Sequence, residues 1–498
     1  MLGIYTNKAN EAAVREFFEL FKTPWEFGEK DKHYAAIIAT TDQPYPIGEQ
    51  LTIVYDGGKA QRADTSTKTP VLNYEGSQIP IYRSLESYDS TAPHQLAPSD
   101  GKSPIRIETS NDRPKAVIDY NLFEEVSFLL KTGQPIEFAH IPTLDLHISI
   151  LRDLLKEHKV PFEEIAPKPD GHPYTICLSH DVDHPKIRFH KFDHTILGFL
   201  ARATLGSVIN LFKSRTSVSN CLRNLSAAIT MPFAQLGLIK DTWASFDKYL
   251  EIEKELPSTF FAIPFKDDPG IAPNGQRKMK RASGYGAEDI KAELECLTAA
   301  AKEIAVHGIN SWSDPNEGRR ELAEIVKFRK SDEKENGIRM HWLYFDSNAF
   351  GTLEDAGYTY DSTVGYNETI GYKAGTSQAF RPIGSDRLLE LPLIIMDTSL
   401  FYPSHLGLTD EEAKEKVMSI FQLARKHGGV VTINWHDRSL APERNWSPLY
   451  KWMIQQGQKD GAWFASMSQA AAWFRERREM TFGAKGSEAP QDEQPNHR

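Results

Sequence analysis

The sequence predicts an α/β protein whose larger part is a parallel (β/α) barrel, preceded by a smaller α/β domain. From residue 174 onward the chain contains several short apolar segments, many with β-branched residues, and each segment ends in reactive side chains. In parallel barrels the functional residues lie at the carboxyl ends of the strands. The segments with this pattern cover residues 174–178, 303–306, 337–338 and 429–435, and a further strand is expected at 258–264.

The first of these strands leads into Ser-His-Asp-Val-Asp-His at residues 179–184. Two aspartates at i and i+2, here Asp181 and Asp183, can serve one metal-assisted reaction. One carboxylate ligates the cation, and the other acts as a base on the bound water. An Asp-rich turn that caps a helix has the same pattern. The motif alone leaves both interpretations open.

Three later strand ends carry histidines, namely His307, His341 and His436. A single histidine at a strand end is more often a structural or surface residue than a functional one. Three of them at equivalent strand ends, together with the two aspartates, favour a common site at one face of the barrel.

These blocks, in this order, resemble the polysaccharide deacetylases of carbohydrate esterase family four, and more specifically the bacterial branch with an extra N-terminal domain. The resemblance spans roughly residues 174–475. It implies a distorted (β/α) barrel, one divalent metal ion that is expected to be zinc, and hydrolysis of an N-acyl or O-acyl group on a sugar. The matching blocks are residues 179–183, 303–308, 339–343, 356–362, 371–377, 390–393 and 434–437.

The resemblance also implies a role for individual residues. Asp181 matches the general base, and Arg339 matches the arginine that orients it. Asp183 and His307 match two metal ligands. His436 matches the late histidine that acts as the general acid.

The sequence departs from the family pattern at Ser311, where a second metal-binding histidine is usual. Catalytic zinc normally has three protein ligands, so Asp183 and His307 would be one short. His341 is the expected third ligand. Residues i and i+2 of a strand face the same side, so Arg339 and His341 can both point into the site. His180 is expected to face away from the site, and His184 to close the turn.

The implied reaction is metal-assisted removal of an acyl group, expected to be acetyl, from an amino sugar or glycan precursor. Two alternatives stay open. The same residues could hydrolyse a non-sugar C–N bond, such as that of a cyclic amide. Ser311 also leaves room for a catalytically inactive carbohydrate-binding or scaffold protein. Trp342, Trp435 and Tyr366 are candidates for stacking on a sugar ring, although each could instead be a core residue.

Composition is typical of a large globular enzyme, with 498 residues, 40% hydrophobic and 25% charged. A formal net charge of −10 does not suggest a nucleic-acid or anionic-membrane partner. The three cysteines are widely spaced and predict no disulfide framework. Residues 1–8 lack a basic region followed by a long apolar core, which predicts a cytoplasmic location. That location favours a nucleotide-linked or lipid-linked sugar, or an oligosaccharide precursor, as substrate.

The expected domains are an N-terminal α/β domain of unknown role at 1–165, a linker rich in Pro and Gly at 166–173, the barrel at 174–480 and a disordered tail at 481–498. Within the first domain the patterns predict helices at 10–22, 121–132 and 144–158. They also predict strands at 34–41, 51–55 and 79–82.

Residues 186–240 are expected to interrupt the barrel as a helical insertion. The apolar run 196–212 predicts a helix that does not span a bilayer, because its 17 residues are marginal in length and include Arg202. One interpretation is a helical hairpin packed on the barrel. The other is contact with a membrane surface or a lipid substrate, favoured by the flanking basic residues Lys186, Arg188, Lys191, Lys213 and Arg215.

Overall fold

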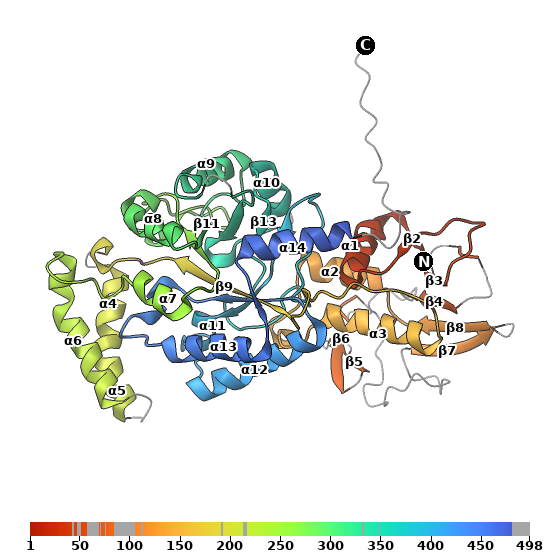
Figure 1. Ribbon diagram of the computed structural model, residues 1–498, viewed down its shortest axis with the longest axis horizontal. Coiled ribbons are helices and arrows are strands. Elements are labelled where there is room, and N and C mark those ends of the chain that lie inside the picture. Colours follow the sequence, from red (N-terminus) through yellow and green to blue (C-terminus); the bar gives the residue numbers. More distant parts are fainter. Residues whose placement is uncertain are drawn as a thin grey trace, which may run out of the picture. The chain divides into compact units, whose positions relative to one another are not determined.

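The computed structural model divides the chain into two compact units (Figure 1). The first comprises Met1–Leu130, Thr143–Ala166 and the chain from Phe474, and the second comprises Lys131–Pro142 and Pro167–Trp473. The predicted tail at 481–498 lies outside the described residues. The structure describes residues 1–41, 44–46, 51–56, 69, 71–74, 76–83, 105–110, 113–190, 193–212, 217–330, 333–346 and 348–480.

The first unit is built on a six-stranded sheet of order β2-β1-β3-β4-β8-β7, in which only the β7–β8 pair is antiparallel. The predicted α/β domain is therefore confirmed in its fold class. A separate antiparallel pair joins β5 (Val71–Tyr74) and β6 (Ser77–Pro80). The sheet strands are β1 (Leu2–Tyr5), β2 (Trp25–Phe27), β3 (Ala36–Thr40), β4 (Leu51–Tyr55), β7 (Ile105–Ser110) and β8 (Arg113–Ile118).

The three helices predicted for this unit are present within one residue of the expected ends. They are α1 (Glu11–Phe21), α2 (Leu122–Lys131) and α3 (Thr143–Glu157). Their apolar residues recur at helical spacing and are buried, as in α1, where Val14, Phe17, Phe18 and Phe21 are all inside. The strands β1, β2, β5, β7 and β8 have no counterpart in the sequence-based assignment.

The second unit contains a nine-stranded, wholly parallel sheet of order β14-β13-β12-β11-β10-β9-β16-β15, with β17 paired to the start of β9. In the described chain no ladder joins β14 to β15, so the barrel is open and distorted, as predicted. The strands are β9 (Thr175–Val182), β10 (Ser258–Ala262), β11 (Glu303–Gly308), β12 (Gly337–Met340), β13 (Tyr360–Asp361), β14 (Leu389–Glu390), β15 (Leu393–Met396), β16 (Val430–Asn434) and β17 (Trp463–Phe464).

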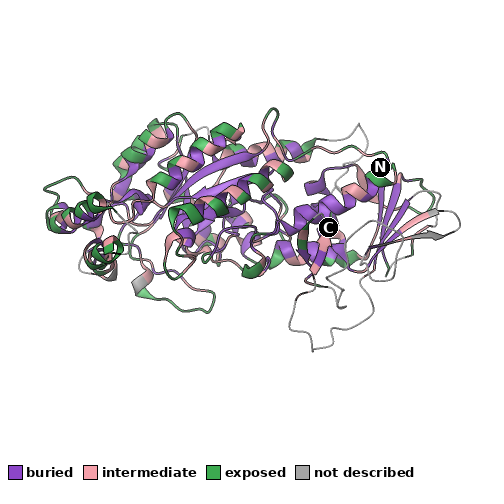
Figure 2. Ribbon diagram, turned by 90° about the horizontal axis from the view of Figure 1, so that it is seen from below, coloured by how far each residue is buried: buried purple, intermediate pink, exposed green. Residues whose placement is uncertain are grey.

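Helices alternate with these strands, and Figure 2 shows buried strands beside helices that expose one side. Helix α12 illustrates why they form. Thr409 and Glu412 make a capping box at its start, and its buried residues Ala413, Val417, Ile420, Phe421 and Ala424 share one face. The barrel helices are α7 (Phe246–Glu253), α8 (Lys291–Ala299), α9 (Pro315–Val326), α10 (Ala349–Ala356), α11 (Asp397–Phe401), α12 (Asp410–His427), α13 (Ser447–Asp460) and α14 (Met467–Glu479).

Contacts place two segments differently from the expected division at residues 165 and 174. Residues 131–142 contact the barrel, where the Gln134 amide donates to the Lys373 carbonyl at 2.7 Å and the Tyr372 amide donates to the Ala139 carbonyl at 2.7 Å. The end of α14 belongs to the first unit, because the buried Arg477 guanidinium donates to the Ile165 carbonyl at 2.7 Å. Neither contact leaves a local sequence signal.

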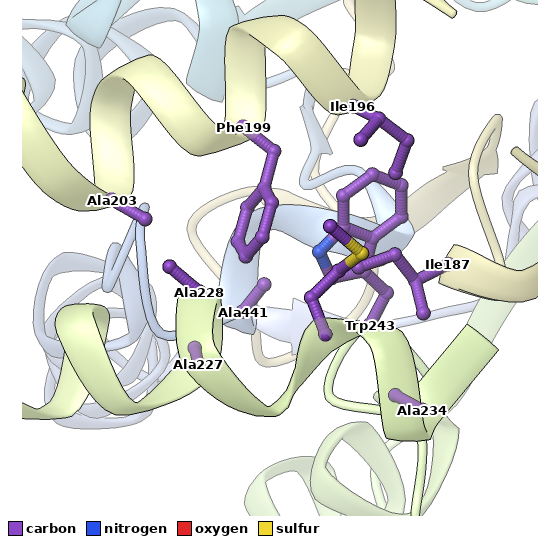
Figure 3. Close-up of a cluster of buried hydrophobic side chains, with 10 residues drawn as sticks. Ile187, Ile196, Phe199, Ala203, Ala227, Ala228, Ala234, Trp243 and Ala441 are labelled. Atoms are coloured by element: carbon purple, nitrogen blue, oxygen red, sulfur yellow. The ribbon is translucent and has the colours of Figure 1, made fainter. Parts of the chain in front are cut away.

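The insertion between β9 and α7 forms a helical hairpin that packs on the barrel (Figure 3). Its first arm runs through α4 (His194–Ala201), a π-helical turn (Arg202–Gly206) and α5 (Ser207–Phe212), and its second arm is α6 (Val218–Gln235). Phe199 and Ala203 meet Ala228 of α6 over Trp243. Within the described residues, the stretch Thr195–Phe212 is the one helix whose length and apolar composition would allow it to cross a membrane.

Candidate active site

A cavity of about 460 Å³ opens at the carboxyl ends of the barrel strands, and five of the six predicted site residues line it. The parallel registers bring these strand ends together, since His307 pairs with Arg339 and Ser179 pairs with Asn434. Arg339 is fully buried and lies behind Asp181. The lining site residues are Asp181, Asp183, His307, His341 and His436.

Three of these residues form a compact group of metal donors. One donor atom each from Asp183, His307 and His341 can be chosen so that all three lie within 4.8 Å of one another. Asp183 Oδ1 lies 3.2 Å from His307 Nε2 and 3.6 Å from His341 Nε2. Ligand atoms on one tetrahedral zinc ion, at about 2.0–2.1 Å from the metal, are roughly 3.3 Å apart. The predicted third ligand is therefore close enough to the other two.

The donor chemistry also fits a divalent cation. His307 Nδ1 lies 2.9 Å from the Arg339 carbonyl, which can only accept, so Nδ1 carries the proton and Nε2 is left to ligate. Burial lowers the pKa of His341 to about 4, which keeps its imidazole in the neutral form that binds metals. Asp183 Oδ1 and His341 Nδ1 are buried without a hydrogen bond, which is costly unless another group compensates.

Ser311, at the position of the usual second histidine, lies outside this group. Its hydroxyl donates to Glu321 at 2.6 Å and lies 3.1 Å from the Tyr358 hydroxyl. Glu321 also accepts the amides of Ile309 and Asn310, so it ties down the loop that follows β11. The structure brings His341, and not Ser311, to the donor group.

Asp181 is held by both carboxylate oxygens. Oδ1 accepts from Arg339 Nη1 at 2.9 Å, and Oδ2 accepts from Asn434 Nδ2 at 2.7 Å. Burial would raise the pKa of Asp181, but the charges of Arg339, His307 and His436 together outweigh it, and the net pKa is lowered. Ser179 and Ser362 accept from the same guanidinium, which fixes its orientation. Asp181 is therefore an ionised, aimed carboxylate beside the donor group.

His436 lines the same cavity and lies near Oδ2 of Asp183, whereas His307 and His341 lie near Oδ1. Its Nδ1 lies 2.6 Å from Asp397 Oδ1, and its amide donates to Oδ2 at 2.7 Å. Burial opposes a charged imidazole, but the Asp397 carboxylate overrides it and raises the pKa of His436 to about 10. Nε2 lies 3.7 Å from Asp183 Oδ2, and its proton is available to a group bound in the cavity.

Asp397 and Asn434 contact candidate site residues, His436 and Asp181, and sequence analysis assigned neither of them a role. Asp397 directly follows the apolar strand β15, so the rule that located the other strand-end residues would have found it. Asn434 stands in a recognised block, but its use as the partner of Asp181 depends on the pairing of β16 with β9.

His180 lies where the sequence predicted, and His184 has a further role in addition to the predicted one. His180 faces away from the site and is buried between Glu253 at 2.7 Å and the Trp435 carbonyl at 2.8 Å. His184 lines the cavity, and its Nδ1 lies 3.1 Å from His190 Nε2. His184 therefore contributes to the cavity wall in addition to the turn after β9.

One of the three aromatic candidates is placed to meet a substrate. Trp342 lines the cavity and stacks on His341, with ring centroids 3.8 Å apart. Trp435 is fully buried and stacks on Tyr450. Tyr366 is buried, and its hydroxyl donates to the Gln134 carbonyl at 2.7 Å. The suggestion that Trp435 and Tyr366 stack on a sugar is wrong, because both are core residues.

Comparison with known proteins identifies similar folds at low similarity. No protein-family model and no curated protein matches the sequence. A protein named as a polysaccharide deacetylase from Mycobacterium smegmatis is 20% identical, with 65% of this chain and 99% of that chain covered and a TM-score of 0.39. An allantoinase is 14% identical, with 64% and 96% covered and a TM-score of 0.41. A peptidoglycan N-acetylglucosamine deacetylase is 10% identical, with 61% and 91% covered and a TM-score of 0.29. At these values the likeness identifies neither the family nor the activity of this chain.

The donor group predicts how metal content responds to substitution. His341→Ala removes one of three ligands, so the affinity for zinc is expected to fall by more than the roughly 10–100-fold that outer-shell changes cost. Ser311→Ala is the matched control and should retain the metal, because Ser311 bonds to Glu321 instead. Metal is measured by mass spectrometry after dialysis against a graded zinc buffer. Equal retention by both variants would remove His341 from the site.

Proposed function

We propose that this chain is a metal-dependent hydrolase that removes an acetyl group from an amino sugar or glycan precursor. The observation that carries the proposal is the arrangement of the cavity. A metal-donor group stands between an ionised carboxylate, Asp181, and a protonated imidazole, His436. The ordered sequence blocks that resemble polysaccharide deacetylases support a sugar as the carrier of the acyl group.

The proposed roles follow from where each side chain points. Asp183, His307 and His341 would hold one divalent ion, which we propose to be zinc; when bound, it polarises the acyl carbonyl and lowers the pKa of water. Asp181 accepts the proton of the attacking water, because Arg339 keeps its carboxylate ionised. His436 donates a proton from Nε2 to the leaving amine, and Asp397 holds its ring in place.

A complete donor set also bears on the catalytically inactive alternative. That alternative rested on the missing histidine at Ser311, and His341 offers a nitrogen near Asp183 in its place. Hydrolysis of a non-sugar C–N bond would use the same residues. Parallel assays of an N-acetylated amino sugar and a cyclic amide, with the same metal-loaded protein, distinguish the two substrate classes. Turnover of the cyclic amide alone would refute the sugar proposal.

The base role predicts that Asp181→Asn abolishes turnover and leaves the metal in place. An amide cannot accept the water's proton, while the three donors of the metal group are unchanged. Asp183→Asn is the matched comparison, since it should lose both activity and metal. Near-full activity of Asp181→Asn on a substrate that the wild type hydrolyses would exclude this mechanism.

The acid role predicts a loss that depends on the leaving group. His436→Ala should lower kcat on an N-acetyl amide by roughly 10²–10⁴-fold, the usual contribution of one general acid–base group. The loss should be much smaller on an activated aryl acetate, whose leaving group departs without protonation. Steady-state rates on both substrates measure the contrast. An equal loss on the two would assign His436 to some step other than proton donation.

The ion pair predicts a shift in the pH profile. Asp181 acts as a base only when ionised, so activity falls as the pH drops through its pKa. Arg339→Ala removes the charge that lowers this pKa, so the acid limb of the kcat/KM profile should move to higher pH. Ser179→Ala is the control, because it removes a neutral partner of the same guanidinium. An unmoved acid limb in Arg339→Ala would contradict the role of the arginine.

A further inference from the structure

The helical hairpin between β9 and α7 exposes an unusual amount of apolar surface. Twelve of the seventeen exposed large hydrophobic side chains in the described part of the chain lie between Leu197 and Ile239. Figure 1 shows the hairpin helices α4, α5 and α6 projecting from the barrel. Contiguous apolar surface of this kind is rare on proteins without a partner and marks a site of interaction.

Helix α6 is apolar on two faces. One face carries Ala227, Ala228 and Ala234, and it packs inward in the cluster around Trp243 (Figure 3). The other face forms a second stripe, whose members follow each other at intervals of four, seven, four and three residues and therefore lie on one side of a helix. This outer stripe consists of Val218, Leu222, Ile229, Phe233 and Leu236, which are 51–74% exposed.

The first arm of the hairpin adds to this surface. Thr195–Phe212 has a mean hydropathy of 1.5, yet only 22% of it is buried. Its most exposed apolar side chains are Leu205 at 71% and Phe212 at 86%. A helix packed inside a protein would bury such residues, so the arm is apolar toward the solvent as well as toward α6.

The charge of the insertion distinguishes between two partners for this apolar surface, a second copy of the chain and an anionic membrane. Residues 186–240 contain eight lysines and arginines and a single acidic residue, Asp193. Lys186 pairs with Glu293 and Lys240 with Asp247, and even without these two the insertion has six basic residues against one acidic residue, within a chain of net charge −10. Two copies of one positive face repel each other, whereas an anionic lipid surface attracts it. An amphipathic, basic helix of this type lies in the plane of the membrane interface. Arg202 within the apolar arm disfavours a spanning arrangement.

The hairpin is joined directly to the proposed active site. His190, Asp193 and Thr195, at its start, line the same cavity as Asp183. His190 links the two regions, since its Nε2 lies 3.1 Å from His184 Nδ1 and its Nδ1 lies 2.9 Å from Asp193. The hairpin that is proposed to contact a lipid surface therefore begins at the cavity wall.

We propose that the hairpin docks this protein on an anionic membrane surface, and that the acylated sugar it acts on is lipid-linked. The docking proposal rests on the exposed apolar stripe of α6 and on the excess of basic residues in the insertion. The substrate class rests in addition on the proposed function, because it needs a cavity that hydrolyses an acyl-sugar. The outer stripe of α6 enters the headgroup region, and exposed basic residues such as Arg188 and Arg223 meet lipid phosphates.

The docking is tested with the full-length protein by flotation with two kinds of vesicle. One contains phosphatidylcholine alone, and the other contains phosphatidylcholine with phosphatidylglycerol. We expect binding to the anionic vesicles, weakened by salt, and a loss of about tenfold or more in the double variant Leu222→Ser/Ile229→Ser. The double variant Ile136→Ser/Val326→Ser alters exposed apolar residues elsewhere and should bind as the wild type does. Circular dichroism checks that both variants are folded.

Several results would overturn the docking. They are no binding to either vesicle, equal binding to both, or a dimer in solution that Leu222→Ser/Ile229→Ser dissociates. A membrane fraction that releases the protein only in detergent, after high-salt and alkaline washes, would show a spanning helix instead.

The substrate class is tested by comparing a water-soluble N-acetylglucosamine oligomer with an alkyl-linked N-acetylglucosamine embedded in the anionic vesicles. Leu222→Ser/Ile229→Ser should keep its rate on the soluble oligomer and lose about tenfold on the embedded sugar. An equal rate for wild type and variant on the embedded sugar refutes the lipid-linked class. If the proposed function is wrong, vesicle binding persists and neither sugar is hydrolysed, so the two failures are distinguishable.

Discussion

The buried ion pair between Asp181 and Arg339 is the interaction on which the site depends. The guanidinium has no exposed surface, so its charge must be compensated inside the barrel. The guanidinium donates to Ser179 and Asp181 of β9 and to Ser362, which follows β13. The backbone carbonyl of Arg339 accepts from His307 and so fixes the His307 tautomer. Loss of one member of such a pair typically costs about 3–5 kcal/mol. One arginine thus orients the proposed base and a proposed metal ligand together.

The parts of the site that could be predicted are those at the ends of apolar strands. Asp181 and His307 lie in the last residues of apolar strands, and Asp183 and His436 lie just after such strands, so a local pattern is enough to find them. His341 was inferred from its i+2 relation to Arg339, although it lies just past β12 in a short turn where Trp342 has a positive φ of 64°. In the structure it reaches the site from this turn, and Trp342 stacks on its ring.

The features that sequence analysis missed depend on contacts between distant segments. Asn434 reaches Asp181 across 253 residues of chain, and Arg477 reaches Leu20 across 457. The fold class, the distorted barrel and three N-terminal helices could be predicted, because apolar periodicity is local. The short strands β1 and β2 and the β7–β8 hairpin could not, because their assignment depends on the neighbours they pair with in the sheet.

The hairpin shows why the net charge of the whole chain is a poor predictor of its binding partner. A net charge of −10 argues against an anionic surface only if the charge is spread evenly, and fields at a surface decay within about 8–10 Å at physiological salt. A membrane would therefore respond to the local excess of lysine and arginine in residues 186–240, and the acidic remainder would be screened. The cavity carboxylates Asp181 and Asp183 lie beside Arg339, His307, His341 and His436, so their negative charge is compensated within the site. Apolar surface and basic charge on the hairpin would therefore place the proposed docking surface and the proposed active site in one unit of the chain.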